Sequence, residues 1–136
     1  MGYYTDYELT MSFCTVGMCH YTMSTIPNAL NKSLSEEIEK MKVFEYGDVD
    51  LGYYASAKWY DWEEDMILLS KRFPGVLFCL HGEGDSSDDM WNAYFFEGGF
   101  QFCPAVITYD EFDPSKLIGS EECLDDTKEV YINDRF

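Results

Sequence analysis

Four carboxylates fall within the seven residues 83–89, and two glycines, Gly82 and Gly84, flank the first of them. Several oxygen ligands from one loop are what a hard cation such as Ca²⁺ binds. The spacing lacks the alternating ligands and the final glutamate of an EF-hand loop. We therefore interpret this stretch as a solvated acidic turn, and the sequence predicts neither a metal nor a cofactor.

Cysteine and histidine are the other metal-binding residue types in the chain. A Cys-x4-Cys-His cluster lies within residues 14–20, but a structural zinc site needs four ligands, and a second pair is missing. Cys79, His81 and Cys103 could approach one another if their strands are neighbours, because Cys79 and His81 share a face by the two-residue period of a strand. Cysteines usually pack as small hydrophobic residues, and we expect the same here.

The chain offers little for nucleophilic catalysis. It contains two histidines, His20 and His81, and lacks a Gly-x-Ser-x-Gly elbow, a Walker motif and a dinucleotide fingerprint. The acidic run 63–65 lies in the first turn of a predicted helix, where the helix dipole favours anions. We therefore do not expect an enzyme. A metal-dependent hydrolase that uses the 83–89 turn is the enzymatic alternative.

Local patterns predict the elements that must position these groups. Apolar residues alternate with polar ones such as Asp6 and Glu8 over 6–13, as in a strand with one buried face. The stretch 16–30 is ambiguous, and we interpret it as a loop or a short added element. A capping box at 33–36 (SLSE) then predicts that a helix begins near Ser33.

The second half continues with one helix and several strands. A strand is predicted over 51–60, and Asp61 with Glu64 predicts a capped helix that Pro74-Gly75 ends. Further strands are predicted over 76–81, 90–96 and 100–109, with a turn at Gly98-Gly99 between the last two. Pro104 favours an edge position for the last strand.

This order of elements, β-α-β-α-β-β-β, predicts an α+β fold. The closest plan is a ferredoxin-like sandwich, with two helices on one face of a mainly antiparallel sheet of four to five strands. The predicted domain covers residues 1–118, and an acidic C-terminal tail follows over 119–136.

The charge of the chain is strongly negative and uneven. The 26 acidic and 9 basic residues give a net charge of −17, while 46% of the residues are hydrophobic and 18% aromatic, which indicates a folded body. Residues 1–82 hold 12 acids and 6 bases, net −6, and residues 83–136 hold 14 acids and 3 bases, net −11. Like-charge repulsion argues against nucleic acid or an anionic membrane as a direct ligand, so basic proteins are the expected partners. Solubility alone remains an alternative role for the charge.

The expected location is the cytoplasm of a bacterial host cell. The sequence shows no signal peptide and no apolar run of the ~20 residues that a membrane span needs. Five cysteines without a regular framework are typical of reduced thiols.

Several runs carry a resemblance to known proteins. Residues 58–66 (KWYDWEEDM), 70–78 (SKRFPGVLF), 82–84 (GEG), 89–91 (DMW) and 94–95 (YF), together with the opening YYTDY, resemble small acidic hypothetical proteins of phages, prophages and other mobile elements. The likeness covers most of residues 3–117. The Lys-Trp strand, the helix and the Phe-Pro-x-Val-x-Phe strand are also similar to YubB-like ferredoxin-type domains. The resemblance implies a fold and a mobile-element origin, and no catalytic residues.

The aromatic residues form a second candidate binding surface. Tryptophan and tyrosine are enriched at binding hot spots, but stripes at helix and strand periods favour a core role. Adjacent tyrosines must point to opposite faces of a strand, so some of them face outward. The residues concerned are Trp59, Trp62, Trp91, Tyr53, Tyr54, Tyr60 and Tyr94.

The functional hypothesis is therefore a non-enzymatic interaction protein that inhibits a basic nucleic-acid-handling protein, such as a restriction nuclease or a CRISPR effector. Its carboxylates would stand in for phosphates, which on duplex DNA give one charge per ~1.7 Å of axis. The alternative is an accessory domain that holds a peptide or small ligand in an aromatic groove. The residues expected to contact the partner are Glu83, Asp85, Asp88, Asp89, Asp110, Glu111, Asp113, Glu121, Glu122, Asp125 and Asp126.

Overall fold

The computed structural model describes residues 4–18, 20–86 and 89–119. The chain forms two compact units, Met1–Val106 and Ile107–Phe136. In the second unit, the described part contains one short 3-10 helix, η1 (Pro114–Lys116). Over the described residues, no helix is both long and apolar enough to cross a membrane.

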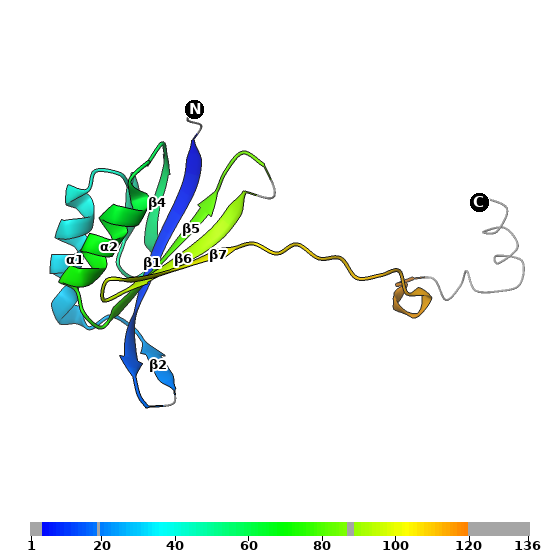
Figure 1. Ribbon diagram of the computed structural model, residues 1–136, viewed down its shortest axis with the longest axis horizontal. Coiled ribbons are helices and arrows are strands. Elements are labelled where there is room, and N and C mark those ends of the chain that lie inside the picture. Colours follow the sequence, from blue (N-terminus) through cyan, green and yellow to red (C-terminus); the bar gives the residue numbers. More distant parts are fainter. Residues whose placement is uncertain (1–3, 19, 87–88, 120–136) are drawn as a thin grey trace, which may run out of the picture. The chain divides into compact units, whose positions relative to one another are not determined.

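The first unit is built on one sheet, to which seven strands belong in the described residues (Figure 1). The strand order is β3-β4-β1-β5-β6-β7, β2 pairs with β1 off this path, and each of these pairings is antiparallel. The strands are β1 (Thr5–Val16), β2 (Tyr21–Ser24), β3 (Tyr46–Asp48), β4 (Gly52–Ala57), β5 (Val76–Glu83), β6 (Met90–Phe96) and β7 (Gly99–Pro104).

Two helices, α1 (Asn28–Lys40) and α2 (Trp62–Arg72), lie on the same side of the sheet (Figure 1). The predicted α+β class is thus confirmed. The expected count of four to five strands is wrong, because β2 and β3 add to the sheet. The ferredoxin-like plan is not confirmed: α1 lies between β2 and β3 in the chain, and the pairings of the described strands are antiparallel, whereas a βαβ unit joins parallel strands.

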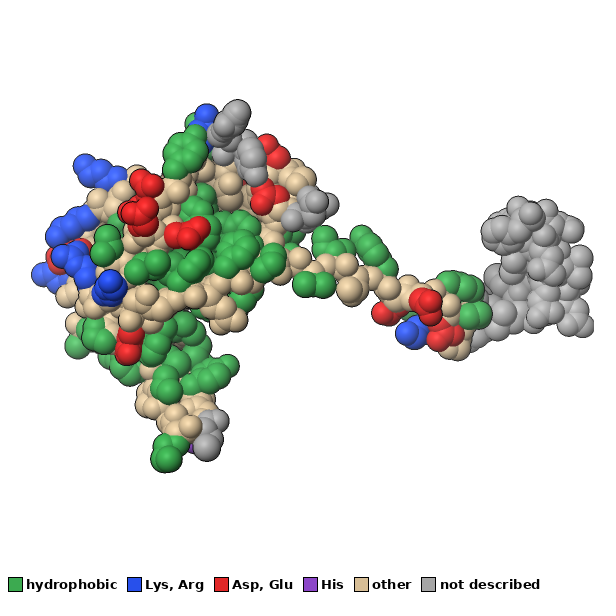
Figure 2. Space-filling view, in the orientation of Figure 1, with side chains coloured by type: hydrophobic (Ala, Val, Ile, Leu, Met, Phe, Trp, Pro, Cys, Tyr) green, Lys and Arg blue, Asp and Glu red, His purple; other side chains and the backbone are tan. Residues whose placement is uncertain are grey.

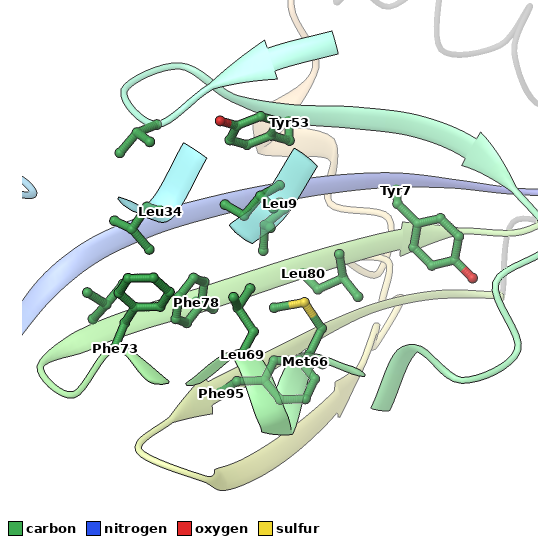
Figure 3. Packing of buried hydrophobic residues seen from close by; sticks show 14 of the residues in the cluster. Tyr7, Leu9, Leu34, Tyr53, Met66, Leu69, Phe73, Phe78, Leu80 and Phe95 are labelled. Carbon is green, nitrogen blue, oxygen red and sulfur yellow. The ribbon is translucent and has the colours of Figure 1, made fainter. Parts of the chain in front are cut away.

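The core lies between the sheet and the helices (Figure 3). The predicted alternation in β1 is confirmed: Tyr7 and Leu9 are buried, and Met11 and Phe13 pack against the same cluster. The neighbouring strands and both helices contribute further buried side chains. The fully buried ones include Leu34, Ile38, Met66, Phe78, Leu80 and Phe95.

Polar contacts fix the helices and turns on this core. The buried Ser70 hydroxyl donates to the Ile67 carbonyl (2.8 Å) and accepts from the Gly98 amide (2.9 Å), which ties α2 to the β6–β7 turn. Arg72 forms an ion pair with Glu37 of α1. These contacts hold the two helices and the hairpin turn in one body.

The capping-box prediction is wrong for α1, whereas for α2 it gives the correct N-cap residue, Asp61, but not the capping hydrogen bond. Helix α1 begins at Asn28, directly after Pro27, and Ser33 lies inside it, so the helix starts more than one turn earlier than its serine pattern suggests. Pro27, with φ −59° and ψ 138°, supplies the extended residue before the helix without a side-chain cap. Asp61 precedes α2 but its side chain makes no capping hydrogen bond.

Glycines explain two sharp features of the sheet. Gly98 (φ +89°) forms the two-residue β6–β7 turn with Glu97 (φ +49°), one residue earlier than predicted. Gly82 lies on the buried face of β5, where the ring of Trp91 covers the space that a Cβ would fill.

Strand β7 ends at Pro104 rather than continuing to Tyr109, and its place at the end of the strand order confirms the predicted edge position.

Candidate functional site

The face of the sheet opposite the helices carries no helix in the part of the chain that the structure describes. Because side chains alternate along each strand, the polar residues between the buried ones of β1 and β5 reach this open face. The register aligns them in rows across the sheet. One row contains Tyr54, Glu8, His81, Asn92 and Cys103.

His81 lies at the centre of this row and is held by two oxygen acceptors. Its Nδ1 is 2.7 Å from Asn92 Oδ1, and its Nε2 is 2.9 Å from Glu83 Oε2. Burial lowers the pKa of His81, but the hydrogen bonds to Asn92 and Glu83 and the negative charges of Glu83 and Glu8 outweigh it and raise the pKa above 6.5. The geometry therefore favours the doubly protonated ring, which donates to both acceptors.

Three carboxylates meet at one end of the open face. Asp6 of β1 is the direct cross-strand partner of Glu83 of β5, and Glu8 is the next residue along the same face of β1. The Glu8 carboxylate accepts from the Tyr54 hydroxyl (3.2 Å), which raises the pKa of Tyr54. Like charges directly opposite each other destabilise a sheet, and protonated His81 beside Glu83 offsets this repulsion.

The acidic turn continues this end of the sheet. Its backbone is closed by hydrogen bonds from Gly84 N to Asp89 O (2.8 Å) and from Asp89 N to Ser86 O (3.0 Å). Asp85 is exposed at the turn. We call Asp6, Glu8 and Glu83 of the open face, together with Asp85 and Asp89 of the adjoining turn, the acidic end.

The sequence-predicted contact residues fall into three groups. Glu83, Asp85 and Asp89 belong to the acidic end. Asp110, Glu111 and Asp113 are exposed in the second unit, where Asp113 accepts from the Ser115 amide (3.0 Å) and Asp110 lies 3.7 Å from Lys116. Five predicted residues, Asp88, Glu121, Glu122, Asp125 and Asp126, lie outside the described residues.

Asp6 and Glu8 are the members of the acidic end that sequence reasoning missed. Their alternation with apolar residues correctly assigned them to the polar face of a strand. It gave no register between β1 and β5, which are far apart in the chain. One signal in the sequence could have found them: polar and apolar residues alternate in both β1 and β5. If two such strands pair, their polar residues must lie on the same face of the sheet.

The strand register shows how far Cys79, His81 and Cys103 approach one another. Cys79, His81 and Cys103 do share the open face, but β6 lies between β5 and β7, and Asn92 separates His81 from Cys103. Among the described residues, no group of three histidine, cysteine or acidic side chains is arranged to hold a metal ion. Burial raises the pKa of the Cys79 thiol above 9.0, which keeps it protonated.

The aromatic residues do not line a common groove. Trp59 and Tyr53 are buried, and the Trp59 indole donates to Asp65 Oδ2 (2.7 Å). Trp62 stacks on Trp91 on the helix side of the sheet, at 4.4 Å between ring centroids. Tyr54 and Tyr94 belong to the open face, and Tyr60 is exposed.

A hollow of about 770 Å³ opens at the other end of the open face, away from the acidic end. It lies between the β1–β2 hairpin, which supplies Tyr21 and Met23, and strands β5 and β6, which supply Leu77, Tyr94 and Phe96. Its lining is mainly apolar. The hollow could receive an apolar side chain or a small ligand.

The raised pKa of His81 predicts a dependence of stability on pH. Because the folded pKa lies above the unfolded value of about 6.5, the stabilisation is fully present below that value and is lost as pH rises through the folded pKa. Urea unfolding at steps between pH 5.5 and 8.5 should show this loss in the native chain. The change should be smaller in His81→Gln, and in Glu83→Gln it should shift to lower pH. An unchanged profile in His81→Gln would contradict the assignment.

Comparison of the chain with protein-family models, curated proteins and solved structures gave no match.

Proposed function

We propose that this protein is a non-enzymatic binding protein whose acidic end contacts a basic, nucleic-acid-handling protein. The observation that supports the proposal is the register between β1 and β5, which brings Asp6 and Glu8 beside Glu83 at the start of the acidic turn. Residues two apart on a strand are spaced by about 6.8 Å and neighbouring strands by about 4.8 Å. Carboxylates at such intervals present a compact anionic surface to lysine and arginine side chains.

Inhibition follows from competition for the same basic surface. A protein that binds nucleic acid uses lysine and arginine to neutralise phosphates, and the acidic end would occupy these side chains instead. The resemblance to proteins of phages and mobile elements favours a target that acts against such elements, a restriction nuclease or a CRISPR effector. In this role the protein works in the cytoplasm of a bacterial host.

A second candidate function is the binding of a peptide or small ligand in the hollow of the open face. The mainly apolar lining from the β1–β2 hairpin and from Leu77, Tyr94 and Phe96 favours it. In this case the net charge of −17 would serve solubility.

The charge hypothesis predicts a specific loss of binding in Asp6→Asn/Glu83→Gln. With about 0.5–1 kcal/mol for each exposed ion pair, we expect an affinity about 5- to 30-fold weaker for the target nuclease or CRISPR effector, and a matching loss in displacement of labelled duplex from it. Affinity should also fall steeply with added salt.

The matched control is Glu36→Gln/Asp50→Asn, which removes the same charge from exposed positions outside the acidic end. Equal effects of the two double variants would mean that the net charge of the protein, and not the acidic end, determines the affinity. Binding that resists both salt and the Asp6/Glu83 change, but is lost in Tyr94→Ala/Phe96→Ala, would favour the second candidate.

A further inference from the structure

In the described part of the chain, strand β7 forms one edge of the sheet, and no further strand pairs with it. It is the last strand in the order, and its pairing with β6 matches Asn92 with Cys103 and Tyr94 with Gln101. The Ala105 amide donates to the Met90 carbonyl (2.9 Å), so Ala105 and every second residue before it in β7 are the ones that hydrogen-bond to β6. Phe100 and Phe102 alternate with these residues, and their amide and carbonyl groups therefore point away from β6.

Over residues 99–103 this edge lacks the usual protection against strand addition. Natural edge strands are blunted by charged side chains, by proline or by bulges. Strand β7 (GFQFCP) carries no charge, and its proline stands at the last position. Phe100 and Phe102 are 39% and 47% exposed, so the accessible edge is also apolar.

An aromatic platform, formed by Trp62, Trp91, Phe100 and Phe102, lies beside the edge on the helix side of the sheet. The Trp62 ring is 6.0 Å from Phe100 and 6.2 Å from Phe102, and Trp91 is 5.7 Å from Phe102. Figure 2 shows hydrophobic side chains gathered on this side of the molecule, with acidic side chains near them. An added strand would place alternate side chains against Phe100 and Phe102, where long aliphatic stems and guanidinium groups pack well.

Charge indicates which chain can occupy the edge. Trp62 stands between the exposed Asp61 and Glu63, and the acidic turn with Asp85 begins beside the Pro104 end of β7. At the other end, Lys71 lies next to Gly98. A second copy of this chain, also with a net charge of −17, would be repelled. A basic segment is attracted, with its bases favoured toward the Phe102 end.

We infer that β7 accepts an extended basic segment of a partner protein as an additional antiparallel or parallel strand. The segment pairs with the free amide and carbonyl groups of Phe100 and Phe102, and its arginine or lysine side chains rest on the aromatic platform near Asp61 and Glu63. The inference rests on the proposed function, because it identifies the part of the basic partner that is bound.

The test uses the full chain and a synthetic ten-residue peptide that alternates arginine and valine. At low ionic strength, hydrogen exchange followed by NMR should slow at least about 10-fold for the Phe100 and Phe102 amides. The amides of β3, at the opposite edge of the sheet, should not change. A peptide of alternating glutamate and valine should give no protection.

Two variants at one position separate backbone pairing from ring contact. Phe102→Val keeps the amide hydrogen and loses the ring, so binding should weaken only a few-fold. Phe102→Pro also removes the outward amide, which the β6 ladder does not use, and should weaken binding at least a further 10-fold. Unchanged circular dichroism of both variants checks that the fold is kept.

The outcomes distinguish this inference from the proposed function. Equal binding by the two Phe102 variants, or binding without protection of Phe100 and Phe102, overturns strand addition. If that binding is still weakened by Asp6→Asn/Glu83→Gln, the proposed function stands without it. Equal protection by the basic and acidic peptides overturns the basic occupant of the β7 edge, and the proposed function is then decided by the Asp6→Asn/Glu83→Gln variant alone.

Discussion

Replacing Phe95 by alanine is expected to lower the free energy of unfolding by about 3–5 kcal/mol. The side chain is fully buried, it stacks on Phe100 at 5.1 Å between ring centroids, and it meets Trp62 edge-on at 6.3 Å. Alanine would leave a cavity under both β7 and α2. Because small domains are stable by about 5–15 kcal/mol, this loss is a large part of the total.

Urea unfolding followed by circular dichroism and by tryptophan fluorescence would measure this effect. The matched control is Tyr60→Ala, since Tyr60 is 75% exposed, and its cost should stay within about 0.5 kcal/mol. A Phe95→Ala chain as stable as Tyr60→Ala would mean that the sheet and α2 do not pack as described.

Replacing Gly82 by valine is expected to cost about 1–3 kcal/mol through overpacking. Gly82 is buried on β5, and any Cβ there would overlap the ring of its cross-strand partner Trp91. The displaced ring would also lose its stack on Trp62. Tryptophan fluorescence should therefore shift at the same time as the unfolding midpoint.

A double-mutant cycle would identify the cause of this loss. In a chain that already carries Trp91→Ala, the valine has room, so Gly82→Val should cost less than in the native chain. Strictly additive costs of the two changes would instead assign the effect to backbone conformation at Gly82.

The sequence predicted those elements whose residues alternate or repeat against the core. Strand β6 was predicted with its observed bounds, and the apolar stripe of α2 was confirmed by the burial of Met66, Leu69 and Phe73. The short strand β3 was missed, and β2 lies in the stretch 16–30, which we interpreted as a loop or a short added element. All residues of both strands are exposed, so no apolar pattern marks them. The predicted start of helix α1 was too far along the chain, because the prediction relied on the serine pattern at 33–36 and not on Pro27.

The candidate site depended on information that no local pattern contains. The acidic turn was visible as a cluster of carboxylates, but its extension by Asp6 and Glu8 requires the β1–β5 register. The pairing of His81 with Asn92 and Glu83 likewise comes from neighbouring strands. Whether the charge acts in binding stays a prediction that the variants above would test.

The central place of β1 has a consequence for biosynthesis. This strand leaves the ribosome first among the elements, but its longest pairing is with β5, about 70 residues later in the chain. At about 5–20 residues per second, β5 follows about 4–14 s after β1. During this interval the apolar face of β1 has no completed sheet to join, and pairing between such distant segments is intrinsically slow. The many acidic side chains of the nascent chain repel other copies in that period, which would limit aggregation before the sheet closes.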